Sequence, residues 1–177
     1  MKAEQFVERL EALAPAITDL QKVGLKENEA IAERKTYHCA KRAKPLSLPD
    51  SNEVVALLTG WNAGQIEIGM IRLFDDPVQI NEGLQIGLVE ADPLVITGGG
   101  EMIVYETNSQ HILWRVAQNP DSFLDALIIA ADFLTKTGID IIDFEDIDAA
   151  KQAANSCAAV VGGSDYTQFY LMLLGGD

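Results

Sequence analysis

The sequence predicts an α+β fold, in which a central, mostly antiparallel sheet of about six strands is flanked by helices. Short β-rich apolar runs separated by glycine turns follow one another between Trp61 and Ala117. A strongly capped helix comes directly after them, and helical spacing of apolar residues marks both ends of the chain. With 177 residues, 48% of them hydrophobic, we expect one compact domain. Its parts are an N-terminal helical segment (1–44), an α+β core (45–138) and a C-terminal helical extension (139–177).

An apolar stripe predicts the first helix. Its members follow at spacings of four and three and are Phe6, Leu10, Leu13, Ile17 and Leu20. Pro15 interrupts the stripe, so either the helix kinks there or it stops near Ala14 and a second helix begins with Pro15 in its first turn. Gly24 followed by Leu25 predicts the end of this region.

The net charge of −14 is unevenly distributed. Residues 1–44 carry nine Lys or Arg against seven Asp or Glu, whereas residues 45–177 carry four against twenty, a balance of −16. Such a field repels nucleic acid and anionic membranes and steers basic proteins toward the surface, although acidity also simply maintains solubility. The positive residues of a polar helix or connector over 26–44 indicate a solvated face or an intramolecular contact with the acidic body rather than a nucleic-acid site; they include Arg34, Lys35, Lys41, Arg42 and Lys44.

A short amphipathic helix is expected next, with Asp50 or Ser51 as its N-cap and Gly60 at its end. Residues 61–64 then turn the chain into the strands. A β-rich run over 66–74 predicts the first long strand.

Gly69 within this run indicates a bulge or a close backbone approach, and Asp75-Asp76-Pro77 predicts the end of the strand. Residues 78–80 and 84–89 are further short strand candidates, and they lie on either side of an Asn-Glu-Gly turn. Gly98-Gly99-Gly100 is the best hairpin signal in the chain, because apolar runs flank it on both sides. A phosphate-binding loop is disfavoured here, since no Lys-Ser/Thr and no helix follow the glycines.

The last strand is expected over 111–117. Its alternation predicts one face made of Ile112, Trp114 and Val116. A helix start follows directly, with Asn119 as the cap and Pro120 at the first position, and the helix should pack across the sheet until Gly138.

The C-terminal extension begins with an acidic run that consists of Asp140, Asp143, Glu145, Asp146 and Asp148. It lacks the alternating ligands and central Gly of a calcium loop, so we expect Asp146 or Asp148 to start a helix. A final apolar helix over 166–174 follows Gly162-Gly163-Ser164. It either fills a groove on its own domain or forms a homodimer surface.

Catalytic chemistry is sparse in this sequence. The two cysteines, Cys39 and Cys157, lack metal-ligand spacing and are expected to be reduced, partly buried thiols. A dyad of His111 with Cys157 is the alternative, but nothing local activates either residue. We therefore predict no catalytic residue, no metal and no cofactor. The absence of a secretory signal and of a run of about 18 apolar residues indicates a cytoplasmic protein without a membrane span.

Several of these features together resemble the SUKH superfamily, which includes yeast cell-wall synthesis regulators and bacterial immunity proteins. The resemblance covers about residues 46–134 and is carried by Leu48-Pro49, Asn62-Ala63-Gly64, Asp92-Pro93-Leu94-Val95-Ile96 with the glycine hairpin, and Ser122-Phe123-Leu124 with Leu127. It implies an α+β fold with flanking helices and a protein-binding role, most often the neutralisation of a toxin from a competing bacterium. Residues 139–177 have no counterpart in the minimal domain.

We therefore expect a non-catalytic protein-binding domain, an immunity protein whose acidic surface covers a basic, nuclease-type toxin. The residues predicted to bind the partner are Asp75, Asp76, Glu90, Asp92, Trp61 and Trp114. Two alternatives stay open. One is a regulatory or scaffold module without a toxin, and the other is a small-ligand-binding protein or enzyme that uses the region of the tryptophans and the glycine hairpin.

Overall fold

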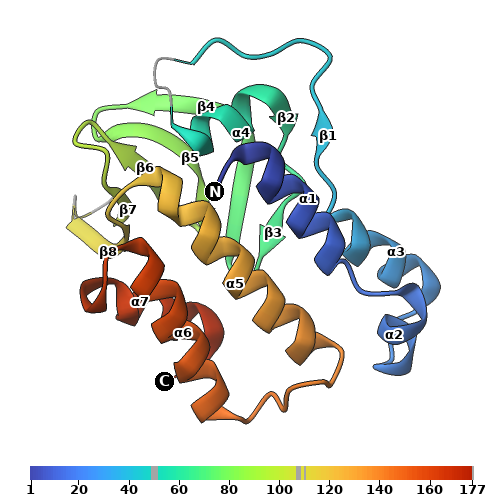
Figure 1. The fold of residues 1–177 in the computed structure, drawn as a ribbon. Coiled ribbons are helices and arrows are strands. Elements are labelled where there is room, and N and C mark those ends of the chain that lie inside the picture. The colour runs from blue at the N-terminus through green and yellow to red at the C-terminus, as the bar shows by residue number, and fades with distance from the viewer. Residues whose placement is uncertain (49–51, 107–108, 110, 177) are drawn as a thin grey trace.

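The protein has the predicted α+β fold, with a six-stranded antiparallel sheet as its centre (Figure 1). The computed structural model describes residues 1–48, 52–106, 109 and 111–176. The sheet follows chain order and consists of β3 (Glu67–Ile68), β4 (Ile71–Ile80), β5 (Gly83–Val89), β6 (Asp92–Thr97), β7 (Met102–Glu106) and β8 (His111–Ala117). A separate small sheet pairs β1 (Ala40–Lys41) with β2 (Trp61–Asn62).

Most of the helices lie over one face of the large sheet, the longest of them running diagonally across it, whereas α2 and α3 project beside the sheet (Figure 1). They are α1 (Ala3–Leu13), α2 (Ile17–Lys22), α3 (Glu27–Lys35), α4 (Glu53–Gly60), α5 (Pro120–Gly138), α6 (Ile147–Val161) and α7 (Thr167–Leu174), with a short 3₁₀ turn, η1 (Ser164–Tyr166). In α5, Asn119 accepts the Ser122 N–H and Pro120 occupies the first turn, as the sequence predicts. None of the helices in the described part of the chain is long and apolar enough to cross a membrane.

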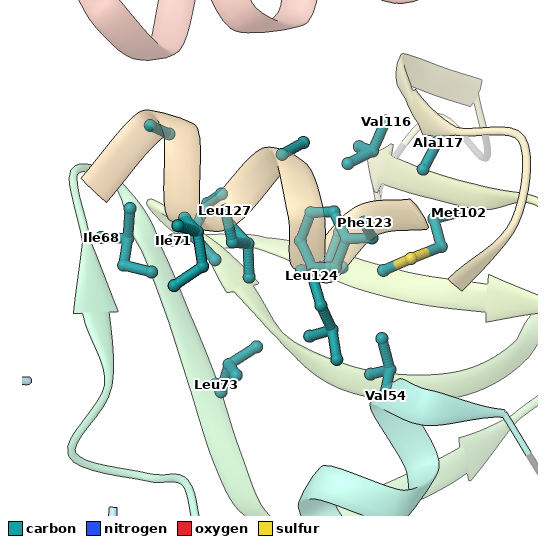
Figure 2. Packing of buried hydrophobic residues seen from close by; sticks show 14 of the residues in the cluster. Val54, Ile68, Ile71, Leu73, Met102, Val116, Ala117, Phe123, Leu124 and Leu127 are labelled. Carbon is teal, nitrogen blue, oxygen red and sulfur yellow. The ribbon is translucent and has the colours of Figure 1, made fainter. Parts of the chain in front are cut away.

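The main core lies between α5 and the sheet. Figure 2 shows Phe123, Leu124 and Leu127 pointing from α5 toward the strands. Phe123 and Leu124 have no exposed surface, and Met102 beside Phe123 has none either. Side chains from α1, α4, α6 and α7 join the same cluster, so all three sequence segments contribute to it. This continuous apolar burial is the main favourable contribution to folding.

The predicted strand over 66–74 is wrong in two respects. Gly69 has φ +57 and forms a turn between β3 and β4 rather than a bulge within one strand. The close approach, the other alternative for Gly69, is present, because a Cβ there would lie 3.1 Å from side-chain carbons of both Leu134 and Leu173. The strand also does not end at Asp75-Asp76-Pro77, because β4 continues through these residues to Ile80. Pairing with β5 is interrupted between Leu73 and Val78. Pro77 lies in this interruption, so its missing N–H removes no hydrogen bond between the two strands.

The alternation predicted for the last strand holds for Trp114 and Val116, which both join the main core, but is incorrect for Ile112. The pairing of β7 with β8 contains two register shifts. As a result Trp114 lies opposite Val104, whereas Ile112 lies opposite the next residue of β7, Tyr105. Val104 belongs to the main core, but Tyr105 belongs to a small second cluster with Val95 and Ile103. Ile112 and Trp114 therefore lie on opposite faces of the sheet.

Two predicted helix boundaries are resolved by the structure. The N-terminal stripe does break into two helices, with Pro15 in the connection between α1 and α2. The predicted caps Asp50 and Ser51 lie outside the described residues, and the cap of α4 is Asn52, whose side chain accepts the Val55 N–H at 2.9 Å.

The C-terminal helix packs on its own domain. Its apolar side chains Phe169, Tyr170, Leu173 and Leu174 are buried, and the Tyr170 hydroxyl donates to the Val116 carbonyl of β8 at 3.1 Å. This matches the first of the two alternatives for α7. A homodimer through this helix stays a prediction.

Phe123→Ala should lower the free energy of unfolding by about 3–5 kcal/mol, because it leaves a cavity between α5 and the sheet. Phe144→Ala is the matched control, since the Phe144 side chain is 85% exposed, and it should change stability by less than about 0.5 kcal/mol. Urea unfolding followed by circular dichroism measures both. Equal losses for the two variants would contradict this account of the core.

Candidate partner-binding site

A pocket of about 410 Å³ opens where the strand turns meet α7. We call it the Trp114 pocket, and it is lined by Met70, Val89, Glu90, Asp92, Val104, Trp114 and Met172. Three of the six residues predicted to bind a partner, Glu90, Asp92 and Trp114, therefore line one cavity. The other polarizable lining residues, Met70 and Met172, were not among the residues predicted to bind a partner.

Strand pairing brings these residues together. Val89 lies opposite Asp92 across the two-residue turn between β5 and β6, and Val104 lies opposite Trp114. Directly opposed residues in an antiparallel pair share a face, so all four side chains lie on the helix-covered side of the sheet. The Glu90 N–H donates to the Met70 carbonyl at 2.8 Å, which ties this turn to the turn between β3 and β4.

Glu90 is one of two non-glycine residues with positive φ in the described part of the chain. Its φ of 55 places it in the left-handed region, which costs a glutamate of order 1 kcal/mol or more. The turn holds this carboxylate at the mouth of the pocket, where the side chain is exposed. Asp92, on the other side of the turn, is half-buried.

The pocket combines an apolar interior with an anionic rim. Val89 and Val104 are buried, while Met70, Trp114 and Met172 are half-buried and flexible or polarizable enough to adapt to a guest. No lysine or arginine lines the cavity, and neither carboxylate forms an ion pair with any residue the structure describes. Such a site suits the side chain of a lysine or arginine. Its methylenes would contact the methionines, its charge would face the Trp114 ring, and its N–H groups would reach the carboxylates.

The remaining predicted residues gather elsewhere, around Arg42. The Arg42 Nε donates to the carbonyls of Leu58 at 3.0 Å and Trp61 at 2.8 Å, and its guanidinium also donates to the carbonyl of Asp75. The Asp75 carboxylate accepts the Gly64 N–H at 2.8 Å, and a Cβ at Gly64 would lie only 2.6 Å from it. Trp61 and Asp75 thus take part in the packing of their own domain.

Lys41 contacts the ring of Trp61, with its Nζ 5.8 Å from the ring centroid. Two cations of the basic segment are therefore held by intramolecular contacts, one of the two explanations that the sequence offered for it. Asp76 is exposed beside this network. That Trp61, Asp75 and Asp76 contact a partner stays a prediction.

The thiols and histidines do not form an activated pair in the described residues. Burial raises the pKa of Cys39 and of Cys157 to about 12. Their Sγ atoms lie near the carbonyls of Asn62 at 3.2 Å and Ala126 at 3.5 Å, respectively. His38 is instead paired with Glu11 at 2.7 Å. Neither thiol supplies appreciable thiolate near neutral pH.

Within the described ranges, no group of three or more His, Cys, Asp or Glu side chains is arranged to hold a metal ion. Comparisons with models of protein families, with curated proteins and with solved structures find no match to this chain. No residue role can be transferred from a relative, so the role of each residue follows from its own contacts.

Arg42→Lys should lower the free energy of unfolding by about 1–3 kcal/mol, because a lysine cannot donate to the Leu58, Trp61 and Asp75 carbonyls together. Lys41→Ala is the neighbouring control and should cost at most about 1 kcal/mol, since it removes only an exposed cation–π contact. Urea unfolding curves give both values. An Arg42→Lys variant that is as stable as the wild type would show that this network contributes little.

Both cysteines should resist alkylation in the native protein, because a pKa of about 12 leaves very little thiolate at pH 8. Reactivity should appear only in denaturant, or above the pH at which these thiols ionise. Asn155→Cys, at an exposed position of α6, provides a thiol that should react at once. Mass spectrometry after iodoacetamide treatment counts the modified sites, and rapid native modification of Cys39 or Cys157 would be inconsistent with their burial.

Proposed function

We propose that this chain is a non-catalytic protein-binding domain, an immunity protein that neutralises a basic, nuclease-type toxin in the bacterial cytoplasm. The observation that carries the proposal is the Trp114 pocket. It places two carboxylates without a cation partner among the described residues beside an apolar interior of methionine and tryptophan. This combination fits a protruding lysine or arginine side chain of another protein.

The charge of the molecule supports a basic partner. Residues 45–177 carry a balance of −16, and such a field accelerates the approach of a positively charged protein at rates that fall with added salt. Enzymes that cleave nucleic acids present cationic surfaces to bind phosphates. Carboxylates held at a pocket rim can occupy the same cationic side chains and so exclude the substrate.

The chemistry of the described residues supports binding over catalysis. The thiols have raised pKa values, and the paired His38 lies on the N-terminal segment rather than at the pocket. The resemblance of residues 46–134 to the SUKH superfamily, whose bacterial members include immunity proteins, points the same way. A scaffold role without a toxin would use the same pocket but would depend less on salt.

Replacing both Glu90 and Asp92 by lysine should weaken binding to the toxin by at least about tenfold, or about 1.4 kcal/mol, because the pocket rim would then repel a cation. The toxin is sought in the neighbouring gene. Growth rescue on co-expression and calorimetry with a catalytically inactive toxin provide the two measurements. Asp75 is unsuitable for this test, since its contacts with Gly64 and Arg42 stabilise the fold.

The matched control replaces Glu4 and Glu8 by lysine. Both are exposed on α1, so this variant has the same net charge as the pocket variant without touching the pocket. Its affinity should fall only through the weaker long-range field. Equal losses for both variants would assign binding to net charge alone, and full rescue by a folded pocket variant would eliminate the pocket. Turnover of a metabolite by the purified chain would overturn the non-catalytic proposal.

A further inference from the structure

The connection between α5 and α6 exposes apolar side chains that a folded protein normally buries. Phe144 is 85% exposed, Ile141 is 66% exposed, and Ile147 at the start of α6 is 46% exposed. No other large apolar side chain in the described part of the chain is as exposed as Phe144. Figure 1 shows that this connection runs along the lower edge of the molecule, away from the sheet. We call residues 139–147 the Phe144 turn.

The Phe144 turn is fixed by hydrogen bonds at both ends. The N–H groups of Ile141 and Ile142 both donate to the Lys136 carbonyl, at 2.8 and 3.2 Å, and close the end of α5. The Asp143 carboxylate accepts the Glu145 N–H at 2.9 Å. Ile142 packs against the main core. A turn held in this way presents its apolar side chains without a large loss of conformational entropy on binding.

The charges around the turn decide what can cover it. Residues 139–148 contain five acidic residues and no lysine or arginine. None of the five forms an ion pair with a residue that the structure describes, whereas Asp132 of α5 is paired with Lys136 at 2.6 Å. An apolar occupant of this surface must therefore bring positive charge with it.

This requirement separates the available occupants. A second copy related by a two-fold axis through the turn would bring two sets of five carboxylates together, which is unfavourable. Anionic membranes and nucleic acids are repelled by the same charges. A protein with an apolar face bordered by lysine or arginine satisfies both the apolar side chains and the carboxylates.

We propose that the Phe144 turn is a docking surface for a basic protein, in which Phe144 and Ile141 pack against an apolar face while the surrounding carboxylates pair with cations along its edges. The inference rests on the proposed function in one respect, since both assign a basic protein as the partner. It uses residues that do not line the Trp114 pocket, so each surface can be removed without altering the other.

The test uses the full chain and two fluorescent amphipathic helical peptides with the same apolar face. One peptide carries lysines along both edges of that face, and the other carries glutamates. Anisotropy titrations should show binding of the lysine peptide, weakened by salt, and no binding of the glutamate peptide. Phe144→Ser should weaken binding by about tenfold, because it removes the main apolar contact. Val160→Ser, on α6 at 41% exposure, is the control and should leave binding unchanged.

Three results would overturn the proposal. One is the absence of binding to the lysine peptide. Another is binding that Phe144→Ser leaves unchanged and that lysines in place of Glu90 and Asp92 abolish, since the peptide would then occupy the Trp114 pocket and support only the proposed function. The third is a concentration-dependent dimer of the wild type, lost in Phe144→Ser by sedimentation velocity, which would assign the turn to a second copy.

Discussion

The structure depends on the packing of α5 against one face of the antiparallel sheet. This helix buries its own apolar side chains and also makes polar contacts with three segments from the first third of the chain. The Met1 ammonium reaches Asp125 at 2.7 Å, the Glu53 N–H of α4 reaches Asp121 at 2.7 Å, and Tyr37 reaches Thr135 at 2.8 Å. Elements distant in the sequence therefore take their positions from α5, and a cavity beneath it weakens them together.

The two surfaces proposed to bind a partner lie where the packing of helices on the sheet is incomplete. At the Trp114 pocket, α7 covers the apolar face only in part, since Met70, Trp114 and Met172 stay half-buried. At the Phe144 turn, the chain must leave α5 and return as α6, so the apolar residues of the connection have no sheet beneath them. Both surfaces thus combine unburied apolar atoms with carboxylates, which is costly for stability and favours a binding role.

Local sequence signals predicted the helix starts and turns better than they predicted how the strands pair. The cap and proline at Asn119 and Pro120, and the glycine hairpin at 98–100, act within a few residues and were correct. The strand end at 75–77 was wrong because the pairing of β4 with β5 continues past an irregularity that only tertiary contacts reveal. Glu90, Asp92 and Trp114 were singled out by charge and aromaticity. Met70 and Met172, more than a hundred residues apart, resemble ordinary core residues until the fold brings them together.

Net charge and local contact act over different distances in this molecule. At physiological ionic strength the field of an exposed charge decays over about 8 Å, so the −16 of residues 45–177 guides an approaching protein without choosing where it docks. The docking position is decided by groups in direct contact with the partner, because partial burial strengthens each ion pair there. Carboxylates beside Trp114 or Phe144 can specify a partner because apolar atoms next to them exclude water, whereas the same charges on an open helix face, such as Glu8, only add to the field.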